Sequence, residues 1–145
     1  MKDVCTELRA IIDATLQEFA ALPESEWTHK PNPAKWSKKE VLGHLIDSAL
    51  NNHRRFIVTQ YSENQNIVYH QDEWVAFQAY QQANTQDLID LWRLINLQIV
   101  RILEVMPKSA YQYTCDTGKD GQHLHTLEWL AEDYVGHLKH HLNDE

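Results

Sequence analysis

Apolar residues recur at spacings of three and four in four long stretches of this 145-residue chain. This spacing places them along one face of an α-helix, and such a face is normally buried against other helices. The first stretch covers about residues 2–22 and stops at Pro23. The third begins after a cap at Asn84 or Thr85 and ends before Pro107. The pattern predicts an all-α, up-down antiparallel four-helix bundle, forming a single domain over residues 1–145.

Capping signals define the other two long helices. Ser37 followed by Glu40 is the pattern of a capping box, so the second helix is expected to run from there to about Gln60. Thr126 is the expected cap of the last helix, and Glu128 in its first turn suits the positive end of the helix dipole.

Two shorter segments connect these helices. Residues 72–82 carry Trp74, Phe77 and Tyr80 at spacings of three, which predicts a short helix that crosses the bundle. Residues 111–121 combine glycines with residues that favour strands, which predicts a loop or a small hairpin.

Composition excludes several classes of function. The chain has 13 basic and 21 acidic residues, a net charge of −8, so we expect no nucleic-acid partner. No apolar run approaches the roughly 18 residues of a membrane span, and the N-terminus lacks a secretory signal, so we expect no membrane partner and a cytoplasmic location. Cys5 and Cys115 have no CxxC spacing and are interpreted as two ordinary thiols.

The nine histidines are unusually many for a chain of this length. His137 and His141 stand four residues apart, so on a helix their rings lie on one face and can share a metal ion, whereas His140 points away. The pair alone is more often a feature of a core boundary. His44, on the second helix, is the candidate third ligand. It shares a polar stripe that is either a solvated face or the wall of a wet cleft (Asp47, Ser48, Asn51 and Arg55).

Three histidines around a metal ion leave positions for water or substrate, and such an ion can activate a water or a thiol. Imidazole suits zinc, nickel, copper and iron alike. Leu138 stands where a zincin has glutamate, so no general base of that kind follows His137, and the catalytic residues stay unassigned. Asp47 and Asp133 could orient an imidazole or accept protons, but ordinary surface acids are an equal interpretation. For Arg55, a solvated side chain is preferred over an anion-binding one.

At these residues the chain resembles the DinB superfamily, in particular its YfiT-like bundle proteins. The resemblance covers essentially the whole chain and is carried by WSKKEVLGHLIDS at 36–48, NHRRF at 52–56 and YVGHLKHHL at 134–142, with Trp74 and Tyr80 between them. It implies one divalent metal ion, nickel or zinc, held by the residues that match its three histidines (His44, His137 and His141). It also implies a homodimer, and activities that include metal-dependent hydrolysis and transfer or isomerisation with a low-molecular-weight thiol.

We therefore expect a metal-dependent enzyme that activates water or such a thiol against a small electrophilic substrate, as a hydrolase or a thiol S-transferase. The alternative is a non-catalytic stress-response or binding module whose metal is structural or absent. A third possibility is a bundle that serves mainly as a dimerisation scaffold.

Overall fold

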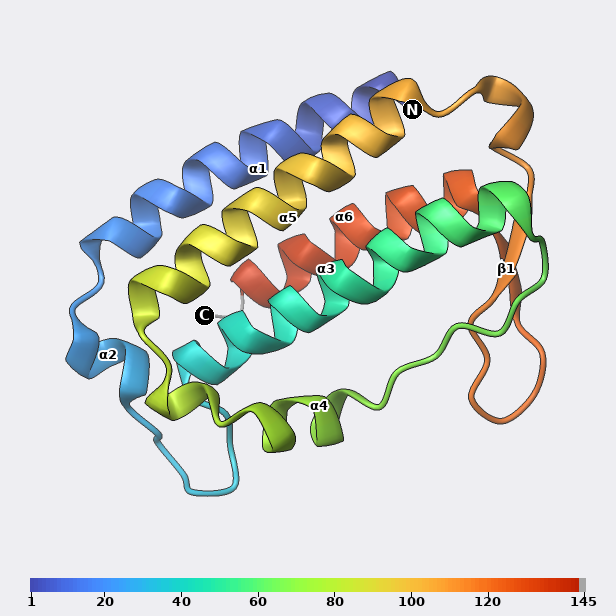
Figure 1. The fold of residues 1–145 in the computed structure, drawn as a ribbon. Coiled ribbons are helices and arrows are strands. Elements are labelled where there is room, and N and C mark those ends of the chain that lie inside the picture. Colours follow the sequence, from blue (N-terminus) through green and yellow to red (C-terminus); the bar gives the residue numbers. More distant parts are fainter. Residues whose placement is uncertain (144–145) are drawn as a thin grey trace.

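Four long helices form where the apolar spacing predicts them, and they pack into a bundle (Figure 1). The computed structural model describes residues 1–143, so residues 144–145 of the expected domain lie outside the described part. The all-α four-helix bundle with a short crossing helix is confirmed. The long helices are α1 (Lys2–Ala21), α3 (Lys38–Tyr61), α5 (Thr85–Val105) and α6 (Leu127–Asn143).

The connections between the helices set which of them are neighbours. α1 and α3 each pack against both α5 and α6. Two pairs of long helices that follow one another along the chain, α1 with α3 and α5 with α6, therefore lie diagonally across the bundle. Strict alternation of direction is broken once, because α3 and α5 run the same way (Figure 1). The segment 62–84 returns along the bundle and allows this. As a result, α3 and α6 lie side by side and antiparallel.

The shorter elements lie in the connections. They are α2 (Glu24–Thr28), α4 (Gln71–Gln78), η1 (Tyr80–Gln82), η2 (Lys108–Ala110), β1 (Thr114–Asp116) and β2 (Leu124–Thr126). α2 was not expected, because five residues are too few to show a period. The helix expected over 72–82 is divided at Ala79, whose φ of 49° is left-handed and ends α4. β1 and β2 pair antiparallel with Cys115 opposite His125, so the predicted hairpin forms but extends beyond residue 121.

The expected caps are present at three helices. Ser37 Oγ accepts from the backbone N–H of Glu40 while the Glu40 carboxylate accepts from that of Ser37, which completes the capping box of α3. Asn84 accepts from the N–H of Asp87 at 3.0 Å. Thr126 accepts from the N–H of Trp129 at 3.1 Å. These bonds hold the first turns of α3, α5 and α6, and so define where each helix begins.

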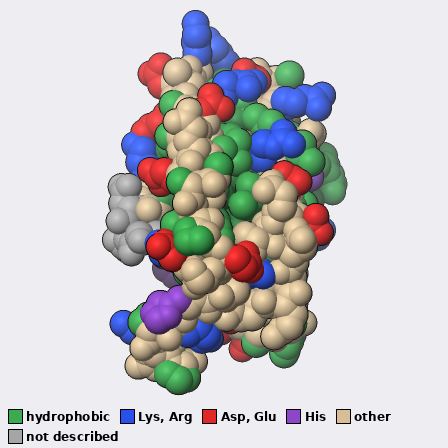
Figure 2. Space-filling model, turned by 90° about the vertical axis from the view of Figure 1, so that its left-hand side faces the viewer, with side chains coloured by type: hydrophobic (Ala, Val, Ile, Leu, Met, Phe, Trp, Pro, Cys, Tyr) green, Lys and Arg blue, Asp and Glu red, His purple; other side chains and the backbone are tan. Residues whose placement is uncertain are grey.

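Both signs of charge occur on the end of the bundle shown in Figure 2. On the described part of that face, acidic and basic side chains are interspersed around exposed hydrophobic ones, so the face carries no continuous basic surface. Within residues 1–143, every helix is too short or too polar to serve as a membrane span.

Candidate metal centre and adjoining polar cavity

The polar stripe of α3 is buried, so the interpretation as a solvated face is wrong. His44 and Asp47 have no exposed surface, and Ser48 and Asn51 are 6% and 8% exposed. The start of the stripe is covered by Tyr80, whose ring lies so close to Gly43 that a Cβ built there would be 2.1 Å from a ring carbon. The glycine is needed because the ring occupies the space of a side chain.

Three imidazole rings converge between α3 and α6. The ring of His44 lies 4.8 Å from that of His141 and 6.5 Å from that of His137, measured between ring centroids. The His137 and His141 rings are 4.8 Å apart, as expected one turn apart on a helix. The sequence-predicted residues are therefore neighbours in space, contributed by two antiparallel helices.

His44 is a neutral imidazole with unused polar atoms. Burial, followed by the nearby His141 and His137, lowers its pKa from 6.5 to about 4. Neither ring nitrogen has a hydrogen-bond partner among the described residues. The ring packs beside Trp36, with centroids 5.2 Å apart. A buried polar group without a partner is costly, and a neutral imidazole is the form that binds metals, so these atoms suit a ligand.

The distances between the three rings agree only partly with binding to a single shared ion. Imidazoles that bind one ion through nitrogen at about 2.0–2.1 Å, in a tetrahedral arrangement, have ring centroids roughly 5 Å apart. Two of the three separations agree with this value, and the distance of 6.5 Å is longer. Among residues 1–143, no group of three or more His, Cys, Asp or Glu side chains forms a metal site as it stands. The donor set fits a divalent ion chemically, but the rings would have to turn for all three to face it.

Asp47 does not orient His44. Its Oδ1 accepts hydrogen bonds from the Tyr80 hydroxyl at 2.6 Å and from Gln78 Nε2 at 2.9 Å. Burial raises the pKa of its carboxyl group, and these two bonds oppose the rise. Asp47 thus ties the end of α4 and η1 to α3. Sequence reasoning missed this role, because nothing in the spacing links residue 47 to residues 78 and 80.

A polar cavity of about 240 Å³ adjoins the histidine cluster. His137 lines it from α6 together with Asp133, one turn earlier. Tyr134 also lines it from α6, and the remaining lining comes from α3, from residues 68–71 and from the hairpin (Ser48, Asn52, Arg55, Val68, Tyr69, Gln71, Thr117 and Lys119). The cavity was not visible in the sequence, because it is formed by four separate segments. It gives a small molecule a place beside the cluster.

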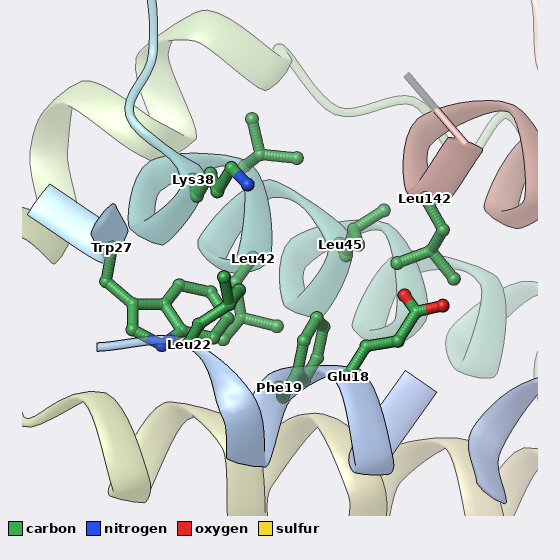
Figure 3. Close-up of a pocket in the computed structure, with 9 residues that line it drawn as sticks. Glu18, Phe19, Leu22, Trp27, Lys38, Leu42, Leu45 and Leu142 are labelled. Atoms are coloured by element: carbon green, nitrogen blue, oxygen red, sulfur yellow. The ribbon is translucent and has the colours of Figure 1, made fainter. Parts of the chain in front are cut away.

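A second cavity, of about 150 Å³, is apolar and lies between α1, α2, α3 and α6 (Figure 3). Leu45 and Leu142, which line it, are the sequence neighbours of His44 and His141. Its other walls are mainly aromatic and aliphatic, with Glu18 and Lys38 as its charged members. It lacks the convergent polar groups of the first cavity, so the histidine cluster and the polar cavity form the candidate site.

Fold and site together define a helical-bundle protein with a buried histidine cluster between two of its long helices. The chain belongs to the DinB superfamily, whose sequence pattern matches residues 7–144. No curated protein matches the chain.

Solved structures with the same fold include the following two. YfiT from Bacillus subtilis superposes with a TM-score of 0.85 at 20% identity, over 97% of this chain and 81% of YfiT. It is described as a probable metal-dependent hydrolase with an unusual four-helix bundle topology. A mycothiol-dependent maleylpyruvate isomerase superposes with a TM-score of 0.79 at 10% identity. That comparison covers 97% of this chain, which spans 59% of the isomerase. At these identities the likeness establishes the fold alone.

Proposed function

We propose that this chain is a metal-dependent enzyme in which His44, His137 and His141 hold one divalent ion, nickel or zinc. The observation that carries the proposal is the convergence of the three rings around a buried His44 whose two ring nitrogens have no partner among the described residues. A divalent ion there supplies positive charge that lowers the pKa of a neighbouring water or thiol, so that a nucleophile forms near neutral pH.

The residues around the ion have separate roles in this proposal. His44 is kept neutral by burial and is held by α3 against Trp36. His137 belongs to both the cluster and the polar cavity, so a small electrophilic substrate bound in the cavity lies beside the nucleophile. Asp133, on the same cavity wall, is the carboxylate placed to accept a proton.

The two structural neighbours support the proposed nucleophiles, which are water and a thiol. YfiT is described as a probable metal-dependent hydrolase, which supports water, and the isomerase depends on mycothiol, which supports a low-molecular-weight thiol as co-substrate. The proposed reaction class is accordingly hydrolysis or thiol S-transfer. A homodimer and a cytoplasmic location stay predictions.

Elemental analysis of untagged protein prepared without chelator tests the site. We expect about one divalent ion per chain in the wild type, and loss of the ion in His44→Ala and in His137→Ala. His53→Ala is the matched control, because His53 lies on α3 with His44 but outside the cluster, and it should keep the ion. Full metal content in a His44→Ala, His137→Ala double variant would refute the assignment. So would a wild type that binds neither nickel nor zinc when these are supplied.

A non-catalytic binding module is the second candidate. It is favoured by the absence, among residues 1–143, of a group already arranged as a metal site. Turnover distinguishes the two candidates. Metal-loaded protein that hydrolyses an activated ester, or transfers a thiol to an electrophile, would exclude the module. A loaded protein inactive in both assays would support it.

A further inference from the structure

Two cations line the polar cavity, and neither forms an ion pair within 4.0 Å with a carboxylate of the described residues. Arg55 comes from α3 and Lys119 from the hairpin loop. Asp133 is the acidic residue of the cavity wall, and it too lies outside the ion pairs that the described residues form. The cavity therefore holds two cations against one carboxylate, in a chain whose net charge is −8.

Arg55 is held rigidly and still has donors to offer. Its Nε and Nη2 both donate to the carbonyl of Ile67, at 3.0 and 2.7 Å, and Nη1 donates to Asn52 Oδ1 at 3.4 Å. A guanidinium has five N–H groups, so three bonds leave two without a partner among the described residues. Burial lowers the pKa of Arg55, which reflects how poorly its charge is solvated. A desolvated guanidinium with free N–H groups is a strong site for an anion.

We infer that the cavity contains a carboxylate-binding subsite formed by Arg55 and Lys119. The inference rests on the proposed function, since it states that one of the two reactants of that site carries a carboxylate. Arg55 lines the cavity and has two N–H groups left to donate, and Lys119, exposed on the hairpin, provides a second charge in its lining. Because His137 lines the same cavity, a molecule held by its carboxylate has its other end beside the histidine cluster.

The volume limits the size of the ligand. The cavity, at about 240 Å³, is slightly smaller than the roughly 300–1,000 Å³ of typical small-molecule sites. It suits a short carboxylic acid or one arm of a larger molecule. The carboxylate can belong to the thiol or to the electrophile, and in either case Arg55 and Lys119 would bind it in the same way.

Calorimetric titration at constant ionic strength tests the subsite. The probes are 3-mercaptopropionate, propionate and 2-mercaptoethanol, each added to metal-loaded and to chelator-treated protein. In chelator-treated protein, where no metal ion is present to bind a thiol, we expect the two carboxylates to bind more tightly than 2-mercaptoethanol. Arg55→Gln should weaken carboxylate binding about tenfold or more, and Lys119→Gln about two- to fivefold. Lys108→Gln is the control, since it removes an equal charge from an exposed site outside the cavity.

The outcomes separate the subsite from the metal site. His141→Ala removes a proposed metal ligand that does not line the cavity, so carboxylate binding should survive in this variant even where metal is lost. If metal loading raises the affinity for 3-mercaptopropionate but not for propionate, the carboxylate belongs to the thiol reactant. If the metal-loaded protein binds both compounds with the same affinity, the carboxylate belongs to the electrophile. Equal affinities for propionate and 2-mercaptoethanol in chelator-treated protein, or an unchanged carboxylate affinity in Lys119→Gln, overturn the inference. Because Lys119 is exposed, that test holds even where Arg55→Gln fails to fold.

Discussion

Replacing Tyr80 by Phe tests whether the buried charge of Asp47 depends on one hydroxyl. The bond is short, 2.6 Å, and its acceptor has no exposed surface. The second carboxylate oxygen, Oδ2, has no partner among the described residues, so Gln78 would be the remaining side-chain donor to this group. Phe keeps the ring that packs on Gly43 and removes only the bond. Hydrogen bonds to charged groups contribute about 1.5–3 kcal/mol, which is the loss of unfolding free energy expected near pH 7.

The loss should depend on pH. The folded-state pKa of Asp47 lies above its ordinary value of 3.8, so the cost of burying the charge is present at neutral pH and disappears as the pH falls below that value. Tyr80→Phe should raise the pKa of Asp47 further, because the hydrogen bond from the Tyr80 hydroxyl lowers that pKa. Near pH 4, where the group is more protonated, the loss should approach the roughly 1 kcal/mol of a neutral hydrogen bond.

Urea unfolding followed by helical circular dichroism measures both values. Tyr61→Phe is the exposed control and should change nothing. Tyr134→Phe is the buried control, because its hydroxyl donates to the neutral Asn96 amide and should give a loss that does not depend on pH. An equal loss near pH 7 and pH 4 for Tyr80→Phe would refute the reasoning that the bond stabilises a charged carboxylate.

Further substitutions test the same region. Gly43→Ala places a Cβ 2.1 Å from the Tyr80 ring and should cost about 1–3 kcal/mol of unfolding free energy in urea; an unchanged value would mean that the ring moves away easily. Gly136→Ala on α6 meets no atom within 4 Å and should instead stabilise by up to about 1 kcal/mol, so a loss there would contradict the packing described. Ser37→Ala removes the capping box and should cost about 1 kcal/mol, seen as a lower thermal midpoint; no shift would mean that the cap contributes nothing.

The long helices were predictable because their apolar faces repeat over many turns and their caps are local signals. The short helix α2 was not predictable, since its five residues (Glu24–Thr28) are anchored by the contact of Trp27 with Phe19, which belongs to a different helix. The break at Ala79 was also missed, because a left-handed alanine carries no sequence signal. The parallel course of α3 and α5 depends on where segment 62–84 runs, and periodicity within a helix contains no information about that.

The candidate site, like the fold, could be predicted from the sequence only in part. The spacing of His137 and His141 determines that their rings are neighbours on α6, and the structure agrees. Periodicity also placed His44 in a polar stripe, but it cannot say what covers a stripe. Tyr80 and Gln78, which cover part of the stripe, come from segment 62–84, and they contribute to its burial.

Within the buried stripe, His44 differs from its neighbours in a way that can be measured. Asn51 donates to the backbone carbonyl of Asp47 at 2.8 Å, and Arg55 donates to that of Ile67, so their burial is offset at least in part inside the protein. His44 has no such compensation among the described residues. Burying a polar group without a partner costs about 1–3 kcal/mol.

His44→Leu should therefore raise the unfolding free energy of chelator-treated protein by about 1–3 kcal/mol while abolishing metal binding. Asn51→Leu, the matched control on the same stripe, should lower stability, because it removes a buried side-chain hydrogen bond to the Asp47 carbonyl, which keeps its helical bond within α3. Urea denaturation of both variants provides the comparison. If His44→Leu destabilises the metal-free protein as Asn51→Leu does, His44 is an ordinary packed core residue. A gain in stability combined with loss of the ion would mean that the protein keeps a destabilising imidazole at this position because metal binding requires it.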